Sequence, residues 1–519
     1  MTKRKFRGLV AVLTVAAAVV AVIATGAYGS SKSGGVLIDG STGTVVNIDP
    51  ANEYDYDSFT VDLNIFQGLY GFPNNATLQP VLATGCTHSS NLKTWTCQLR
   101  HNVKFSNGDP MTSADVKYSF DRVQKIKGDQ GIYTLLSYLK STTVSGKYTV
   151  VFHLTNPDSI WPYILSTNAG YIVDHKTFPS NAILSNTDTA HMIGTGPYVL
   201  TKFTPGAGGQ AVFGLNPHYW GTAPANSGLI INYYSSSATM KLDLENKTLD
   251  MAFQTFDPTE IAAMSNNPNL TVHQGNGVVI RYLVFNVKRK PFNNLNVRKA
   301  IAYLMPRQTI AADYHHTVTP LYSMVPKGLP GQTDAFKTLY GASPSLTKAK
   351  AAMKAAGVKT PLAITLWYTP THYGAFSANE YADIQRALNK SGLFKVTLKT
   401  AEWAQYSGAL GKAYGAFQLG WFPDYPDADD YTVSFYQTGS FYSNGYSSTK
   451  MDGLIKKERA ATGTARYNYL KQIQTLGAQD IPTIPYWQGN MIAVSQKSVQ
   501  GINKTLDAAF YMRFWKISK

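Results

Sequence analysis

The segment from 229 to 275 alternates between the two hydrophobic periods that distinguish strands from helices. Three apolar runs are typical of buried strands: LIINYYS (229–235), LDMAF (249–253) and TVHQG (271–275). Residues 238–248 have helical spacing, and DPTEIAAMSNN continues as a second helix opened by Asp257 and Pro258. Because strands that alternate with helices usually pair in parallel, this order predicts an α/β unit with a parallel sheet.

The same alternation returns independently in the later half of the chain. Three runs are typical of strands: LAITLWY (362–368), FKVTLKT (394–400) and AFQLGWF (416–422). SLTKAKAAMKAAG (345–357) is predicted to be a helix that ends at Gly357. Residues 377–390 form another, with Tyr381, Ile384 and Leu388 at helical spacing. Two separate α/β units predict two lobes with a cleft between them.

Residues 92–154 follow a different pattern. WTCQLRHNVKF leads into the turn signal SNGDP, and Thr112 and Asp115 then resemble a capping box, with Asp in place of Glu. KYTVVFHL (147–154) is predicted to be a strand with alternate apolar residues on one face. This region is therefore expected to be a smaller α+β insert.

The N-terminus has the pattern of an export signal. Four basic residues lie within MTKRKFR, and the 16-residue run from Leu9 to Ala24 contains Thr14 as its only polar residue. Such a run is short for a membrane span and close to a signal-peptide core, so we expect export with cleavage near Ala24 or Ala27. An uncleaved anchor over 1–27 is the alternative. Ala27 stands where a lipoprotein signal would have Cys, which predicts free secretion or a retained anchor without a lipid.

The composition is that of a globular protein with a basic surface. A chain of 519 residues is too long for one core, so two or three domains are expected. Lys and Arg number 47 against 31 Asp and Glu, and removal of 1–27 lowers the formal net charge from +16 to +12. This charge suits either a surface tuned for solubility or contact with anionic wall polymers or lipid headgroups. No cluster of basic and aromatic residues predicts nucleic-acid binding.

The two cysteines, Cys86 and Cys97, lie in GCTHSSNLKTWTC. In an exported protein, two nearby cysteines favour a disulfide, and closing so short a loop would stabilise the fold by roughly 3 kcal/mol. Metal binding is not favoured here, because only His88 is close by.

Motifs of common enzymes and cofactor sites do not occur in the sequence. HExxH, GxSxG and GxxxxGK[ST] are missing, and GTGPYV (194–199) lacks the third glycine of a dinucleotide fingerprint. The histidines show no metal-ligand spacing, and the adjacent pair His315 and His316 is expected in a surface loop. The sequence therefore predicts no catalytic residue, no metal site and no cofactor.

The acidic stretch GWFPDYPDADDY (420–431) concentrates four Asp beside aromatic side chains. It fails as an EF-hand, lacking Gly at position six and Glu at position twelve. Asp424 directly follows a buried-type strand and Pro423, which places it where open α/β sheets bind ligands. A partly desolvated carboxylate there would favour an ammonium group, with Trp421 and Tyr425 as walls. An acidic surface turn, or one member of a glycosidase-like carboxylate pair, remains open from spacing alone.

Longer blocks of the chain resemble a known family. LKTWTCQLRHNVKFSNGDPMTSADVKYSFDRV (92–123) is similar to the signature of the family 5 extracytoplasmic solute-binding proteins, the oligopeptide-, dipeptide- and nickel-binding components of ABC importers. Further similar blocks follow in the family order: VNIDPANEYD (46–55), GTGPYVLTKF (194–203), FNVKRKPFNNLNVRKAIAYLMPR (285–307), GWFPDYPDADDY and IPTIPYWQ (481–488).

The resemblance implies an α/β, two-lobed clamp of the periplasmic-binding-protein type (type II, cluster C). The implied parts are the signal peptide or anchor at 1–27, lobe one at 35–286 with an α+β subdomain at about 60–185, lobe two at 287–482, and a return to lobe one at 483–519. RYLVFN (281–286) and IPTIPYW (481–487) are expected to be the crossing strands.

The resemblance also implies a function without catalysis. The chain would be an extracytoplasmic receptor that captures peptides between its lobes and delivers them to ABC permease subunits, acting as a monomer. Asp424 would hold the ligand's N-terminal ammonium, and the expected ligand-binding set is Asp424, Trp421, Trp403, Phe422 and Tyr425. The remaining carboxylates, Asp427, Asp429 and Asp430, are expected to be turn and helix-start residues.

Some alternatives stay open at this point. The same clamp could bind an oligosaccharide or a nickel complex, or act as an adhesin or sensor, and a secreted hydrolase is the rival from another class. No Arg is assigned to a ligand carboxylate. Arg281 is a candidate, and a core or hinge role fits it equally well.

Overall fold

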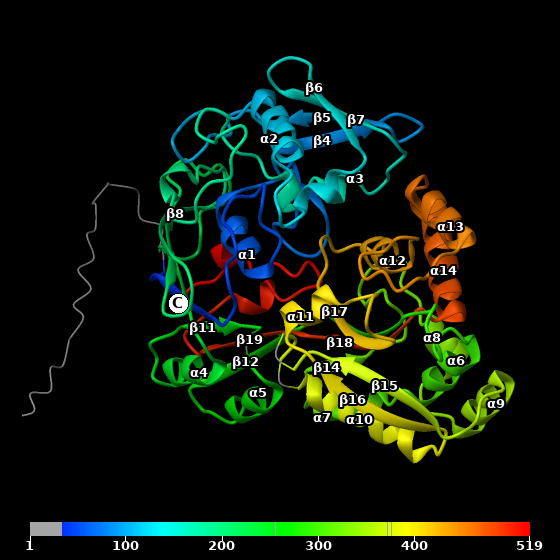
Figure 1. Cartoon of the computed structure of the whole chain (residues 1–519). Coiled ribbons are helices and arrows are strands. Elements are labelled where there is room, and N and C mark those ends of the chain that lie inside the picture. Colours follow the sequence, from blue (N-terminus) through cyan, green and yellow to red (C-terminus); the bar gives the residue numbers. More distant parts are fainter. Residues whose placement is uncertain (1–33, 255, 371, 375) are drawn as a thin grey trace, which may run out of the picture.

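The computed structural model describes residues 34–519 except 255, 371 and 375, so the predicted signal segment at 1–27 lies outside the described residues. Three sheets of four or more strands organise this part of the chain (Figure 1). Within it, no helix is long and apolar enough to cross a membrane.

The seven-stranded sheet belongs to the lobe that contains both ends of the described chain. Its strand order is β12 (Leu270–Gly275), β19 (Met491–Gln496), β11 (Met251–Phe253), β1 (Leu37–Ser41), β10 (Leu229–Tyr233), β9 (Gln210–Leu215) and β8 (Tyr198–Thr204). Its main helices are α1 (Tyr56–Ile65), α4 (Ser237–Glu245) and α5 (Pro258–Met264). The predicted order of strands and helices between 229 and 275 is confirmed.

The pairing of this first sheet differs from the prediction. β1 pairs in parallel with β10 and β11, but β19 runs antiparallel between β11 and β12, so the sheet is mixed. The reason is that strands from both ends of the described chain enter the unit predicted from 229–275. Local periodicity carries no information about such distant partners.

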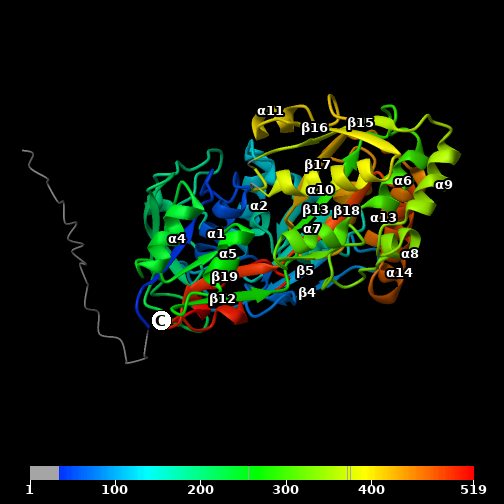
Figure 2. The same cartoon turned by 90° about the horizontal axis from the view of Figure 1, so that it is seen from below.

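The six-stranded sheet organises the second lobe. Its order is β14 (Val318–Pro320), β18 (Thr483–Gly489), β13 (Ile280–Phe285), β17 (Ala416–Trp421), β15 (Leu362–Tyr368) and β16 (Phe394–Thr400). Its helices are α6 (Leu295–Leu304), α7 (Arg307–Asp313), α8 (Ala335–Tyr340), α9 (Leu346–Ala356), α10 (Ser377–Lys390), α11 (Trp403–Gly408), α12 (Asp430–Tyr436), α13 (Thr449–Arg459) and α14 (Gly463–Asp480). Figure 2 shows the two lobes side by side.

The chain passes between the two large sheets twice. One passage joins β12 to β13 at 276–279, and the other joins β18 to β19 at Asn490. The strands expected to cross, β13 and β18, both lie in the six-stranded sheet, where β13 pairs with β17 and β18. β13 is buried along its whole length because both of its faces are covered: Tyr282 and Val284 pack into one core, and Leu283 and Phe285 pack into another. Sheet membership thus changes near 276–279 and at Asn490, and the predicted lobe boundaries at 286/287 and 482/483 stay predictions.

The α+β insert contains a four-stranded antiparallel sheet, in the order β4 (Ala83–His88), β5 (Thr94–Leu99), β7 (Thr149–Leu154) and β6 (Leu139–Val144). α2 (Ser113–Ile126) and the short α3 (Trp161–Ile164) accompany it, and β2 (Tyr70–Gly71) pairs with β3 (Gln79–Pro80) nearby. The predicted capping box at Thr112 and Asp115 is confirmed, since both of its hydrogen bonds are present at the start of α2.

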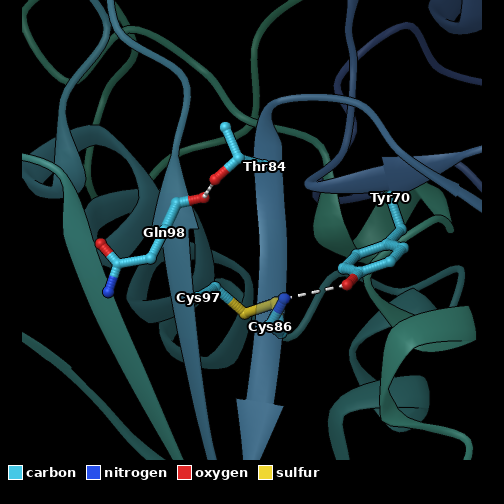
Figure 3. The surroundings of a disulfide bond; sticks show 5 residues. All are labelled: Tyr70, Thr84, Cys86, Cys97 and Gln98. Atoms are coloured by element: carbon cyan, nitrogen blue, oxygen red, sulfur yellow. Dashed lines mark hydrogen bonds between the residues drawn. A yellow bond between two sulfur atoms is a disulfide. The ribbon is translucent and has the colours of Figure 1, made fainter.

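A disulfide joins two adjacent strands of this insert. Cys86 on β4 lies opposite Cys97 on β5, and the two sulfur atoms are bonded (Figure 3). The backbone N–H of Cys86 donates to the Tyr70 hydroxyl at 3.0 Å. The bond thus fixes the register of two strands at one edge of the small sheet.

Candidate ligand-binding site

The loop that follows β17 lies where the two lobes meet. β17 is an inner strand of the six-stranded sheet, and Asp424 comes three residues after its last residue, Trp421. From the first lobe, the Tyr54 hydroxyl donates a hydrogen bond of 2.8 Å to Oδ2 of Asp424. Tyr54 precedes α1, so this contact joins segments 370 residues apart. Asp424 therefore lies beyond the carboxyl end of a strand and at the boundary between lobes, as the sequence predicted.

Asp424 lines two adjoining cavities. The larger has a volume of about 570 Å³ and is bounded by the insert on one side and by α12, the 437–441 loop and Arg459 on the other. The smaller, about 30 Å³, lies between Asp424, Phe422 and Phe510. Tyr54 lines both cavities beside Asp424. A ligand group entering either space would reach this carboxyl.

The electrostatics of Asp424 are those of a carboxylate without a cation. Burial raises its pKa to about 7, and the hydrogen bond from Tyr54 opposes that rise only in part. Among the described residues of 34–519, no Lys, Arg or His lies within ion-pair distance of it, and the neighbouring arginines pair with other carboxylates. A ligand ammonium would supply the missing positive charge and favour the ionised form.

Asp430, the first residue of α12, lines the same large cavity. Its Oδ2 accepts a hydrogen bond of 2.8 Å from Nε1 of Trp421. Burial raises its pKa well above the usual value, and the nearby Asp424 carboxyl raises it further. The indole of Trp421 is consequently oriented by Asp430, and its ring stacks on Phe441 at 5.3 Å.

Asp427 and Asp429 lie at the turn and the helix start, as expected, and both also form buried ion pairs, which the sequence analysis did not predict. Asp429 pairs with Arg459 at 2.6 Å, and the charge of Arg459 lowers the pKa of Asp429 to about 2 despite its burial. Asp427 pairs with Arg466 and also accepts the backbone N–H of Asp429 at 2.8 Å. The turn hydrogen bond exists, but the distant arginines could not be read from the local sequence. These pairs hold the loop that carries Asp424.

Phe422 and Tyr425 differ in their surroundings. Phe422 is 39% exposed and stacks on Phe510 of the first lobe, with ring centroids 6.4 Å apart. Tyr425 is buried among the side chains of the insert, and its hydroxyl donates to Asp429 at 2.7 Å. Phe422 is thus available at the cavity mouth, whereas Tyr425 anchors the loop through its hydroxyl.

Trp403 lies apart from the Asp424 cavities. It stacks on His372 with ring centroids 3.6 Å apart and an interplanar angle of 4°. His372 lines a third cavity, of about 540 Å³, that both lobes enclose and that also contains Arg281. The structure therefore brings Trp421, Phe422 and Tyr425 together around Asp424. Trp403 lies elsewhere, packed against His372 of the third cavity. Their roles toward a ligand stay predictions.

Tyr54 is the site residue that the sequence reasoning missed. It lies within VNIDPANEYD, a block quoted for its resemblance, but nothing in local spacing connects it with a residue 370 positions later. Asp430 was assigned to a helix start, and its contact with Trp421 was not foreseen. Both depend on tertiary packing.

One group of acidic and histidine side chains could hold a metal ion among the described residues, formed by Asp115, Asp174 and His175. It belongs to the insert, and its carboxylates already accept local hydrogen bonds from Thr112 and Asn107. It does not include Asp424.

Comparison with known proteins agrees with this architecture. The family model described as bacterial extracellular solute-binding proteins, family 5 Middle, matches residues 77–443. The probable D,D-dipeptide-binding periplasmic protein DdpA of Escherichia coli (strain K12) is 26% identical over 509 residues, covering 92% of this chain and 93% of the relative. The glutathione-binding protein GsiB of Salmonella choleraesuis (strain SC-B67) is 26% identical over 485 residues, covering 89% and 91%.

A similar fold is known from solved structures. The ABC transporter-associated periplasmic binding protein DppA from Helicobacter pylori, solved in complex with the peptide STSA, superposes with a TM-score of 0.77 at 21% identity. The alignment covers 94% of this chain and 98% of that protein. The predicted two-lobed α/β clamp is thereby confirmed as the fold.

Proposed function

The chain belongs to family 5 of the bacterial extracellular solute-binding proteins, and from this premise we propose that it is the receptor of an ABC importer that captures peptides between its two lobes. Asp424 would bind the N-terminal ammonium of the peptide. The ligand would then be passed to permease subunits in the membrane, without catalysis, by a monomeric receptor outside the cytoplasm.

The observation that carries the proposal is the environment of Asp424. Its carboxyl is held between lobes by the neutral hydroxyl of Tyr54 and has no cationic partner among the described residues. Desolvation penalises the lone carboxylate, which is why its pKa is raised to about 7. A bound ammonium removes this penalty through a charge-assisted hydrogen bond. The site is therefore suited to a ligand that brings one positive end.

The names of the relatives support a peptide as the ligand. One is named for D,D-dipeptides and another for glutathione, and both ligands are small peptides. Extended peptides can gain affinity by pairing their backbone with protein groups, while ordered water fills the space around varied side chains. The large cavity beside Asp424 leaves room for such water.

Closure of the clamp would couple capture to transport. Within the part of the chain that the structure describes, two short connections, at 276–279 and at Asn490, join the large sheets, so the lobes can turn about them. A ligand that touches both Tyr54 and Asp424 favours the closed arrangement because only that state contacts it from both sides. The closed form would be the one presented to the permease.

Calorimetric titration with short peptides tests the proposal. Asp424→Ala should weaken binding by about 2–5 kcal/mol, because the ligand ammonium would lie buried without a counter-charge. N-acetylation of the peptide should cause a similar loss with the unaltered protein and little further loss with the variant. Asp129→Ala, at an exposed position of the insert, is the matched control and should bind normally. Heat from oligosaccharides but none from peptides would show that the ligand class is wrong.

A further inference from the structure

The excess positive charge of this chain comes from one segment of the second lobe. Residues 288–399 contain 16 Lys and Arg against 4 Asp and Glu, whereas the rest of the chain after position 27 contains 27 basic and 27 acidic residues. The formal charge of +12 that remains without residues 1–27 is therefore the charge of this segment alone. Because a surface tuned only for solubility mixes both signs, this uneven distribution favours a particular contact.

The pairing of the six-stranded sheet gathers much of this charge at one end of the lobe. β15 pairs in parallel with both β16 and β17, so these three strands begin at the same edge of the sheet. β13 is antiparallel to β17 and therefore ends at that edge. The segments there carry the run KRK at 288–290 and five lysines, which together we call the basic end: Lys354, Lys359, Lys390, Lys395 and Lys412.

Contacts between these segments confirm that they are neighbours. The guanidinium of Arg289 donates to the carbonyl oxygen of Lys412 at 3.2 Å. The backbone N–H of Leu362 donates to the carbonyl oxygen of Leu393 at 2.9 Å, which joins the connections that lead into β15 and β16. Figures 1 and 2 both place α9 on the side of the second lobe away from the first. The basic end thus lies on the outer side of the second lobe.

The positive charges of the basic end are exposed and unpaired. All eight side chains are exposed, and no carboxylate among the described residues lies within ion-pair distance of them. Asp480, which precedes β18 at the same edge, is half-buried, and its carboxylate accepts a hydrogen bond of 2.6 Å from the Tyr446 hydroxyl. Protection of the edge strand β16 against pairing accounts for Lys395, but not for the basic residues outside that strand.

We propose that the basic end binds the anionic headgroups of a lipid bilayer and holds the receptor at the membrane that contains its permease. Clustered Lys and Arg are attracted by the negative potential of anionic lipids, and this attraction acts within about one Debye length of the surface. The proposal goes beyond the peptide function and does not depend on the identity of the ligand.

The shape of the basic end suits a flat partner. Its side chains are spread over the ends of four neighbouring strands, roughly 14 Å at ~4.8 Å per strand, and over the adjoining helix ends. They line neither of the large cavities beside Asp424 and Arg281. A broad, exposed surface of one sign lets many charges approach the face of a bilayer together.

Docking by the basic end would leave the candidate ligand site free. Lys412 precedes β17, whereas Asp424 follows it. The six residues of β17 separate these two ends by roughly 17 Å at ~3.3 Å per residue. The bilayer would therefore approach the second lobe from the side remote from Asp424.

Sedimentation with lipid vesicles tests the proposal. The exported protein is mixed with vesicles of phosphatidylcholine alone or with about 30% phosphatidylglycerol. It should sediment with the anionic vesicles at about 0.05 M salt and be released at about 0.5 M, because salt screens exposed charges. Equal sedimentation with neutral vesicles, or none with anionic vesicles, would overturn the proposal.

Two combined variants assign the binding to the basic end. The first should weaken partitioning onto anionic vesicles at least tenfold; it combines Lys354→Gln, Lys359→Gln, Lys390→Gln and Lys395→Gln. The matched control removes four exposed charges from the first lobe and its insert and should weaken partitioning less than about threefold; it combines Lys104→Gln, Lys125→Gln, Lys140→Gln and Lys202→Gln. Equal losses in the two variants would show that net charge acts without regard to position, and would overturn the proposal.

A dissolved phosphate polymer is the other partner that such a charge could serve. Binding of soluble poly(glycerol phosphate) by the unaltered protein, without sedimentation on anionic vesicles, would overturn the bilayer assignment. No peptide is used in these experiments, so their failure would leave the peptide function standing. Absence of peptide binding in calorimetry would likewise leave the membrane contact standing.

Discussion

The binding role proposed for Asp424 is accompanied by a cost to the stability of the unliganded fold. The burial that favours a cation also raises the carboxyl pKa to about 7, so the group is protonated in part at neutral pH. Binding of an ammonium requires the ionised form. Proton release from Asp424 and capture of the ligand are therefore linked.

The affinity for a peptide should depend on pH in a defined way. Below about pH 7 it should fall roughly tenfold per pH unit, because Asp424 must first lose a proton. Above about pH 8 it should fall again as the α-amino group of the ligand loses its charge. Calorimetry between pH 5 and pH 9 measures this profile. A flat acidic limb in the unaltered protein would contradict the role of Asp424.

The stability of the unliganded protein should depend on pH in the opposite direction: between about pH 4 and pH 7 it should fall as the pH rises, whereas the affinity for the ligand should increase. A carboxyl with a raised folded-state pKa binds its proton more tightly in the folded than in the unfolded state, so its contribution is present at low pH and is lost as pH rises from about 4 to 7. Asp424→Asn should therefore be more stable than the unaltered protein at pH 8, by on the order of 1–3 kcal/mol, and show no such gain at pH 4. Urea unfolding at the two pH values measures the difference. A gain that is equal at both values would refute the shifted pKa.

At the scale of elements, the loop between β17 and α12 depends on buried ion pairs with α13 and α14. Arg466, on α14, pairs with both Asp427 and Glu458. Arg459, the last residue of α13, pairs with Asp429 and lies 4.0 Å from Asp158 of the insert. These helices thus fix the loop that presents Asp424 and connect it with the first lobe.

Removal of one arginine should be strongly destabilising. Arg466→Met leaves two buried carboxylates without a cation and should lower the free energy of unfolding by about 3–5 kcal/mol. Urea unfolding of the unliganded protein measures this loss of free energy. Lys354→Met, on the exposed face of α9, is the control and should leave the free energy of unfolding nearly unchanged. A loss below about 1 kcal/mol would show that the network contributes little.

The disulfide in the insert should contribute to stability without affecting the ligand site. Replacing both Cys86 and Cys97 by Ser should cost roughly 3 kcal/mol, because the closed loop restricts the unfolded chain. Chemical unfolding of the oxidised protein and of the double variant measures this difference in the free energy of unfolding. Peptide affinity should stay the same, since neither residue lines a cavity at Asp424. A stability loss near zero would contradict the prediction.

Much of the local structure could be predicted from the sequence, for identifiable reasons. α10 coincides with the predicted 377–390 because its buried face has helical spacing, and Gly357 ends α9 in the left-handed conformation that glycine adopts readily. Asp424 was predicted from its place after a buried strand. Tyr54, the arginine partners of Asp427 and Asp429, and the entry of β1 and β19 between strands of the predicted unit all involve distant segments, for which local patterns contain no signal.

At the scale of the whole molecule, the two-lobed arrangement predicts that the proposed ligand binding changes the shape of the receptor. The two lobes lie side by side (Figure 2), and the chain passes between their sheets at 276–279 and at Asn490. The candidate site contains residues of both lobes, since Tyr54 of the first donates a hydrogen bond to Asp424 of the second. Small-angle X-ray scattering should therefore show a smaller radius of gyration when a bound peptide is added, and no change for Asp424→Ala at the same peptide concentration. A radius that is unaffected by a saturating peptide would contradict closure.

The central claim is that this receptor captures peptides by their free N-terminus. Its most direct test is to offer the purified protein an equimolar mixture of short peptides, N-acetylated peptides, oligosaccharides and nickel–histidine complexes, and to identify by mass spectrometry what it retains. We predict that peptides with free N-termini are retained and that Asp424→Ala loses them. Retention of oligosaccharides or nickel complexes in place of peptides, or equal retention of N-acetylated and free peptides, would contradict the claim.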